Sequence, residues 1–118
     1  MIRILFTLAL TALAAFAQNA PATGVFMVSH IDVTPDHSAE TAQLLKQYAT
    51  DTRKDKGLVR VDVLVQDGRP NHFTIVELWQ TRLALDAHTA LPHTVQFREK
   101  LHPFLGSPFD DRIHAAIP

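Results

Sequence analysis

The side chains best suited to acid–base chemistry lie between residues 73 and 101. Glu77 is a carboxylic acid within the apolar run HFTIVELWQ, on the same strand face as Ile75 and Trp79. A carboxylate among apolar groups is costly unless it is paired or protonated, so Glu77 needs a partner. His88 and His93 follow in the next segments, and a histidine exchanges its proton near neutral pH. These residue types indicate proton transfer.

Helical spacing turns both histidines towards the interior. His88 follows Leu85 by three residues, on the apolar face of a helix expected over 82–89. His93 precedes Phe97 by four residues, on the apolar face of a second helix expected over 92–101. We therefore expect one cavity between the sheet and the helices, gathering Glu77, Trp79, His88 and His93.

Two interpretations of this cluster remain open. In the functional one, a histidine acts as base towards a phenolic or enolic substrate and Glu77 orients it. Trp79 and Phe97 then supply flat apolar walls for a ring system. In the structural one, Glu77 hydrogen-bonds a histidine or a backbone amide and holds a helix on the sheet.

Other chemistries lack a motif. His88 and His93 are five residues apart, and the sequence contains no HxH, HxxxH or HExxH spacing, so no metal site is predicted. Only four glycines are present, without a phosphate-binding loop for NAD, FAD or ATP. There is no cysteine, and no serine lies in a nucleophile elbow. No cofactor is therefore expected.

The elements that must position these residues follow a recognisable order. Strand patterns cover 25–33, 59–66, 72–80 and 111–117. A helix over 38–56, capped by Gly57, follows the first strand, and the two shorter helices follow the third. The order β-α-β-β-α(α)-β is the split βαβ arrangement of an α+β fold with a four-stranded sheet.

The strand over 72–80 is apolar on both faces. One layer of helices covers only one face of a sheet, so the second face needs another cover. The simplest cover is a second copy of the chain, so a homodimer that pairs through its sheet faces is expected.

The first seventeen residues, MIRILFTLALTALAAFA, resemble an export signal. Arg3 precedes a short apolar stretch, and the end of the segment fits the small-x-small pattern cleaved before Gln18. The alternative is a membrane anchor, but the apolar run is shorter than the roughly 18–20 residues of a span. We expect a signal peptide over 1–17, a tether over 18–24 and a periplasmic or secreted domain over 25–117.

The net charge of −1 gives no reason to expect nucleic acid as a partner.

A longer stretch carries a family resemblance. The run ELWQTRLALDAHTALPHTVQFREKL, preceded by GLVRVDVLVQ and DGRPNHF, resembles the antibiotic biosynthesis monooxygenase domain, and most closely its quinol-monooxygenase-like branch. In that family a strand ending in E-x-W precedes a helix with ALxAH and a second helix with H and F. The matching residues here are Glu77, Trp79, 84–88, His93 and Phe97. The resemblance covers about 25–117.

The resemblance implies a ferredoxin-like fold that dimerises into an α+β barrel. It also implies oxidation of a quinol or phenolic aromatic by O2 without a cofactor, since a deprotonated electron-rich ring can itself give an electron to O2. His88 is then the preferred base and Glu77 its orienting acid, while Trp79, His93 and Phe97 line the pocket. The alternative is a non-catalytic module of the same fold that binds an aromatic ligand or serves a stress response. A pure interaction platform is a third reading.

A haem-degrading branch shares this fold. It relies on an Asn on the first strand, a Trp on the short helix and a His on the next helix. Ser29, His88 and Arg98 align with those places. All three differ, so haem degradation is not expected.

Overall fold

The computed structural model describes residues 23–118. The predicted signal peptide over 1–17 and most of the predicted tether over 18–24 lie outside the described residues. The described elements are, in order, β1 (Val25–Asp32), the 3-10 helix η1 (Pro35–His37), α2 (Ser38–Thr52), β2 (Leu58–Gln66), β3 (Arg69–Trp79), α3 (Arg82–Thr89), α4 (Pro92–Leu101), η2 (His102–Phe104) and β4 (Asp110–Ala115). No helix in this part of the chain is long and apolar enough to cross a bilayer.

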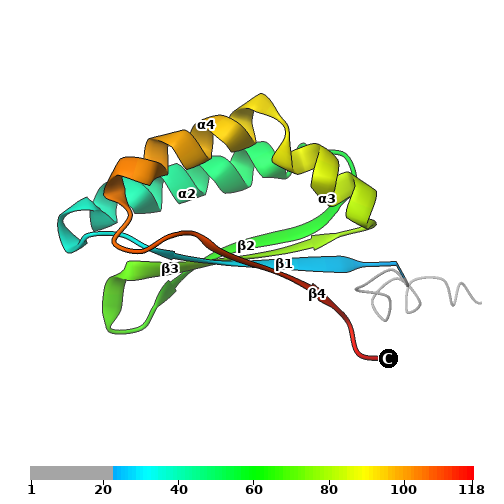
Figure 1. The fold of residues 1–118 in the computed structure, drawn as a ribbon, viewed down its shortest axis with the longest axis horizontal. Helices are drawn as coiled ribbons and strands as arrows, with labels where there is room; N and C mark the ends of the chain where they lie inside the picture. The colour runs from blue at the N-terminus through cyan, green and yellow to red at the C-terminus, as the bar shows by residue number, and fades with distance from the viewer. Residues whose placement is uncertain (1–22) are drawn as a thin grey trace, which may run out of the picture.

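The four strands form one sheet in the order β2-β3-β1-β4, and every neighbouring pair is antiparallel. Helices α2, α3 and α4 all lie on the same side of this sheet (Figure 1). The predicted βαββαβ order and the ferredoxin-like α+β fold are therefore confirmed.

The core lies between the helices and the inner face of the sheet. Its main cluster joins β1, β2 and β3 to α2 and α4, and includes Ile31, Leu45 and Leu101, each at most 2% exposed. Burying such an aliphatic side chain contributes about 1.5–3 kcal/mol. A smaller cluster of Met27, Trp79 and Leu85 lies where α3 meets the sheet. This second cluster supports the candidate site.

Helix α2 ends earlier than the sequence suggested. We expected a helix to Lys56, but it ends at Thr52. The amides of Lys54 and Asp55 bond to carbonyls three residues back, at 3.1 and 3.0 Å, so the chain continues as turns. Gly57 completes the reversal with a φ of +86°, which glycine adopts without strain. Asp55 consequently lies in a loop and not on a helix face.

The hairpin between β2 and β3 is tighter than predicted. The strands predicted over 59–66 and 72–80 leave a loop over 67–71, but β3 already begins at Arg69 and only Asp67 and Gly68 form the turn. Gly68 has a φ of +75°, as two-residue hairpin turns of this kind require. The last strand, predicted over 111–117, is Asp110–Ala115.

The outer face of the sheet has an apolar centre. On the two central strands Leu78 pairs with Phe26, and Val76 pairs with Val28. The strands on either side place polar groups beside them, among them Asp62 on β2 and others on β4. None of the described helices covers this face (Figure 1).

Candidate active site

Glu77 lies on the inner face of β3 and is only 2% exposed. The indole Nε1 of Trp79 donates a hydrogen bond of 2.9 Å to its Oε1, and the hydroxyl of Tyr48 donates to its Oε2. The carboxyl group thus has two hydrogen-bond donors within the protein. Glu77 therefore has the hydrogen-bond partners that a buried acid requires. One of them, Tyr48, was not selected in the sequence analysis.

Tyr48 reaches this position from α2. Its ring packs against Phe97 of α4, with ring centroids 4.3 Å apart, and its hydroxyl lies 2.9 Å from Nε2 of His88. Burial, together with the nearby carboxylate of Glu77, raises the pKa of the Tyr48 phenol far above its ordinary value. The hydroxyl therefore stays protonated and can both donate and accept a hydrogen bond.

His88 occupies the inner face of α3, and its side chain is 2% exposed. Its ring lies against the indole of Trp79, with centroids 4.6 Å apart. Nε2 faces Tyr48, while Nδ1 lies 2.6 Å from a carboxylate oxygen of Asp55. Both ring nitrogens are thus occupied, so His88 meets no substrate directly in this arrangement.

Asp55 and His93 complete the cluster towards the surface. Nε2 of His93 lies 3.0 and 2.8 Å from the two carboxylate oxygens of Asp55. The side chains of Asp55 and His93 are 10% and 26% exposed. Nδ1 of His93 is buried without a hydrogen-bond partner. The cluster therefore runs from a fully buried acid to a histidine in contact with solvent.

We call the connected groups Glu77, Tyr48, His88, Asp55 and His93 the relay. Tyr48 has one proton, yet its oxygen lies within hydrogen-bond distance of both Glu77 and Nε2 of His88. Two hydrogen bonds need two protons, so the second proton resides on Glu77 or on His88. Shifting both protons through the Tyr48 hydroxyl converts one arrangement into the other. The arrangement can therefore transfer a proton between Glu77 and His88.

The structure gathers the predicted residues into one place. Glu77, Trp79, His88 and His93 belong to the same hydrogen-bonded cluster, and Phe97 packs on Tyr48 beside it. Trp79 is 0% exposed and packs behind Glu77, so it presents no wall to an open cavity. Phe97 and His93 line a small pocket of about 60 Å³ between α2 and α4.

Tyr48 and Asp55 are the residues that sequence reasoning missed. Both fall within the helix predicted over 38–56 and neither was selected as a site residue. A buried phenol usually needs a polar partner, and that rule is the signal that could have found Tyr48. Asp55 lies 33 residues before His88 and Tyr48 lies 29 before Glu77, so no local periodicity connects them.

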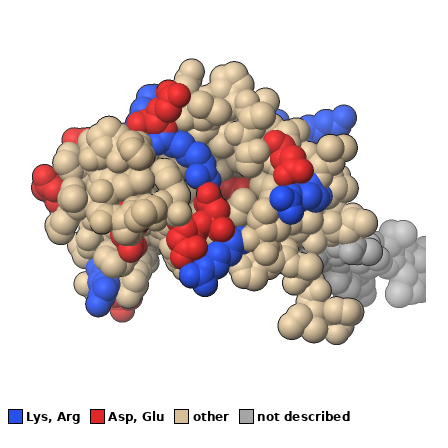
Figure 2. Space-filling view, viewed as in Figure 1, with Lys and Arg blue, Asp and Glu red and all other residues tan. Residues whose placement is uncertain are grey.

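Beside Glu77, the inner face of the sheet continues through β1 to the edge strand β4. Across the sheet Glu77 pairs with Met27 and Met27 with Ile113, which is 43% exposed. Figure 2 shows a hollow on this face, between the helices and the edge of the sheet, with acidic atoms at its floor. On the inner face of the described strands the acidic side chains are Glu77 and Asp111.

Two of the positions aligned with the haem-degrading branch meet at this edge. The hydroxyl of Ser29 donates a 2.6 Å hydrogen bond to Asp111, and Arg98 pairs with the other oxygen of Asp111 at 2.9 Å. The guanidinium of Arg98 also lies 4.6 Å from the centre of the Phe109 ring. These contacts join β1, β4 and α4 beside the hollow.

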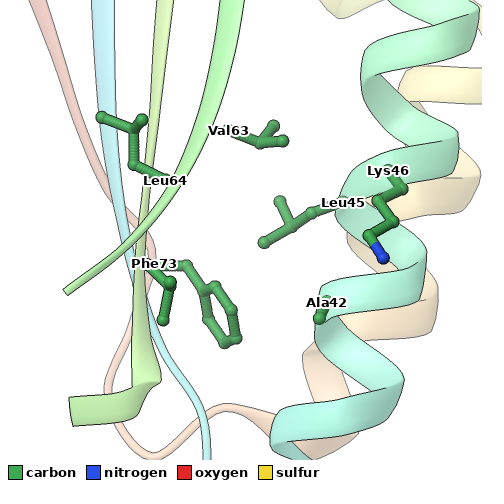
Figure 3. A pocket seen from close by; sticks show the side chains of 7 residues that line it. Ala42, Leu45, Lys46, Val63, Leu64 and Phe73 are labelled. Atoms are coloured by element: carbon green, nitrogen blue, oxygen red, sulfur yellow. The ribbon is translucent and has the colours of Figure 1, made fainter. Parts of the chain in front are cut away.

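A separate apolar pocket lies between α2 and the β2–β3 hairpin. It measures about 150 Å³ and is lined by Ala42, Leu45, Lys46, Val63, Leu64, Val65 and Phe73. Figure 3 shows Phe73 and Val63 on the sheet side facing Leu45 and Ala42 on the helix side. None of the predicted site residues lines it.

Metal-binding potential, which the sequence spacing did not indicate, arises from the tertiary structure. Asp55, His88 and His93 each offer a ligand atom, and these atoms all lie within 4.8 Å of one another. The third ligand comes from a loop far upstream of the two histidines.

Comparison with known proteins agrees with this architecture. Residues 24–100 match the family model described as antibiotic biosynthesis monooxygenase. An uncharacterised protein of Synechocystis is 27% identical over 90 residues, which are 76% of this chain. The match spans only 61% of that curated relative, so the chain covers about three fifths of its length.

Solved structures share the fold. Rv0793 from Mycobacterium tuberculosis is 25% identical with a TM-score of 0.74, over 80% of this chain and 96% of that one. A variant of SnoaB, a cofactor-independent oxygenase from Streptomyces nogalater, is 19% identical with a TM-score of 0.72, over 80% and 94% of the two chains. At that lower identity the likeness concerns the fold alone.

Proposed function

Since the chain belongs to the antibiotic biosynthesis monooxygenase family, we propose that it oxidises a quinol or related phenolic aromatic with O2 and without a cofactor. The observation that carries the proposal is the relay, in which one tyrosine hydroxyl links a buried carboxyl group to His88, and Asp55 links His88 to the partly exposed His93. Removing a proton from a ring hydroxyl is the step that such an oxidation asks of the protein.

The chemistry balances without an added electron carrier. A deprotonated phenol passes one electron to O2, and the ring radical and superoxide then join in a C–O bond. The peroxide anion takes up the proton that the phenol gave to the protein, and loss of water from the resulting hydroperoxide leaves a carbonyl. One oxygen atom enters the product, the other leaves as water, and the substrate supplies every electron.

In this proposal the substrate occupies the hollow beside β4 and its hydroxyl contacts Glu77. Each proton that Glu77 accepts displaces one along Tyr48 and His88 towards Asp55 and His93, and the same path returns a proton to the peroxide formed on the ring. Trp79 positions Glu77 through its 2.9 Å hydrogen bond, and Phe97 positions Tyr48. The burial of these groups keeps water away from the reacting ring.

The test measures O2 uptake by the full chain with menadiol or anthrone. Tyr48→Phe removes only the hydroxyl that joins Glu77 to His88, and loss of a proton-transfer group lowers a rate by about 100-fold or more. His88→Ala should be similarly slow. The matched control is Thr41→Val, on the same helix, whose buried hydroxyl has no partner. With labelled O2, the product should carry one labelled atom.

Equal rates for the unaltered chain, Tyr48→Phe and His88→Ala would remove the relay from the mechanism.

The second candidate is a non-catalytic module for aromatic ligands, favoured by the 150 Å³ apolar pocket (Figure 3). A dry apolar cavity of about that size can hold one benzene ring. Saturable binding of a phenol without O2 uptake would support this candidate and contradict the first.

We also propose that residues 1–17 direct export to the periplasm or medium. The motivation is the cationic residue Arg3, followed by a short apolar stretch and the small residues that end at Ala17. The exported chain should begin at Gln18 on N-terminal sequencing. An uncleaved chain retained in membranes would contradict this.

A further inference from the structure

We propose that Asp55, His88 and His93 form a binding site for a divalent transition-metal ion. The three residues come from the loop after α2, from α3 and from the start of α4, and their ligand atoms lie within 4.8 Å of one another. Nδ1 of His88 and Nε2 of His93 both point at the carboxylate of Asp55, at 2.6 and 2.8 Å. This proposal does not depend on the proposed oxidation.

The donor set has the chemistry of a transition-metal site. Two imidazole nitrogens and one carboxylate oxygen suit zinc and its neighbours in the first transition row, and sites with three protein ligands leave further positions open. The side chain of His93 is 26% exposed, so water can fill those positions.

The geometry requires movements of about an ångström. Ligand atoms around a tetrahedral ion with bonds of about 2.0–2.2 Å lie roughly 3.3–3.6 Å apart. The present separations from the carboxylate are 2.6 to 3.0 Å, and the two histidine nitrogens lie within 4.8 Å of each other. Asp55 lies in a loop and His93 is the second residue of α4, so both can adjust around His88.

The side chains on the far side of His88 orient its ring in the way that a metal-binding histidine needs. Its Nε2 lies 2.9 Å from the hydroxyl of Tyr48, which in turn donates to Glu77. Metal-binding histidines commonly make such a bond through the second ring nitrogen, and it fixes the orientation of the ring. The relay thus supplies an outer shell as well as a ligand.

Charge balance gives an independent argument. The side chains of Asp55 and Glu77 are 10% and 3% exposed, and no described lysine or arginine pairs with either. Buried carboxylates need compensating positive charge. Protons on the histidines can supply it, and so can one divalent ion. Because the ion takes the atoms that carry those protons, the metal-bound form cannot conduct protons along the relay.

The test is calorimetric titration of the full chain, freed of metal with EDTA and dialysed, with Zn²⁺. One ion per chain is expected. His93→Ala removes the most exposed ligand and should weaken the affinity at least about tenfold, because even loss of an outer partner of a ligand costs about 10–100-fold. Asp55→Asn keeps the side-chain shape and should weaken it similarly. His102→Ala, an exposed histidine outside the cluster, should bind as the unaltered chain does.

Absence of binding at millimolar Zn²⁺, or equal affinity in His93→Ala, would overturn the proposal. Circular dichroism of each variant separates loss of a ligand from loss of folding. Titration with Co²⁺ gives a second readout, because ligation by the histidines produces visible absorption. O2 uptake measured in EDTA tests the proposed oxidation separately, so the two proposals can fail independently.

Discussion

At the scale of single residues, the cost of burying Glu77 explains much of the site. A carboxyl group that is 2% exposed is tolerated because Trp79 and Tyr48 make hydrogen bonds with its two oxygens. When one partner of a buried hydrogen bond is removed, the remaining group is left unsatisfied, and the full cost of its desolvation then destabilises the folded state. The hydroxyl of Tyr48 serves two such groups, Glu77 and His88.

Tyr48→Phe should therefore lower the free energy of unfolding by about 2 kcal/mol or more, since one unsatisfied buried group costs about 1–3 kcal/mol. Thr41→Val is the matched control on the same helix. The hydroxyl of Thr41 is buried without a partner, so its removal should be neutral or stabilising. Urea unfolding measures both values, and equal losses for the two variants would contradict the argument.

Part of the site was predictable at this scale. The rule that a buried acid needs a partner pointed to Glu77, and helical spacing brought His88 and His93 towards it. The identity of the partner was not predictable, because Tyr48 and Asp55 meet the cluster only through the packing of α2 and its loop on the sheet. The same packing gives each ring nitrogen of His88 a partner, Tyr48 at Nε2 and Asp55 at Nδ1.

At the scale of elements, the loop between α2 and β2 decides where Asp55 lies. Gly57 accepts a 2.8 Å hydrogen bond from the amide of Gln80, next to the start of α3. A Cβ at Gly57 would lie 2.5 Å from Cβ of Ala84 on α3. This close approach holds the loop against the helix that carries His88.

Gly57→Ala should consequently destabilise the protein more than Gly68→Ala does. Both glycines have positive φ, at +86° and +75°, which costs an alanine about 1–2 kcal/mol. Only Gly57 adds a steric clash, since nothing lies within 4 Å of a Cβ at Gly68. We expect an additional loss of about 1 kcal/mol or more for Gly57→Ala in thermal unfolding. Equal losses would argue against the close contact.

Element type was easier to predict than element boundaries. Strict alternation in 59–66 and the apolar spacing in 82–101 identify strand and helices correctly. The end of α2 was wrong by four residues, because the charged residues 53–56 are compatible with a helix and only the backbone hydrogen bonds of the turn decide otherwise. Pro70 and Asn71 are residue types typical of turns but lie in β3. The sequence therefore predicted a longer loop than the two-residue turn.

At the scale of the whole molecule, the uncovered face of the sheet is the main feature. Phe26, Val28, Val76 and Leu78 form its apolar centre, and no described helix covers it; Leu78 is 5% exposed and the other three are partly buried. An apolar patch with a polar rim is typical of an interface between copies. We propose that two chains pair through this face, as the apolar pattern of β3 suggested.

Analytical ultracentrifugation should then show a dimer for the full chain. Val76→Lys places a charge at the centre of the face and should shift the equilibrium to monomer, because an unpaired buried charge is costly. Leu83→Lys is the control, since Leu83 on α3 is 79% exposed. A monomer at all concentrations, or the same effect in both variants, would exclude pairing through this face.

The position of the aromatic side chains in the relay has an optical consequence. Trp79 is the single tryptophan of the chain and Tyr48 its single tyrosine, and both donate hydrogen bonds to Glu77. Nearly all intrinsic fluorescence of the protein therefore originates within one cluster, with the indole ring against His88. The molecule carries its own spectroscopic reporter, and a change in emission colour or intensity records events at this cluster without any attached dye.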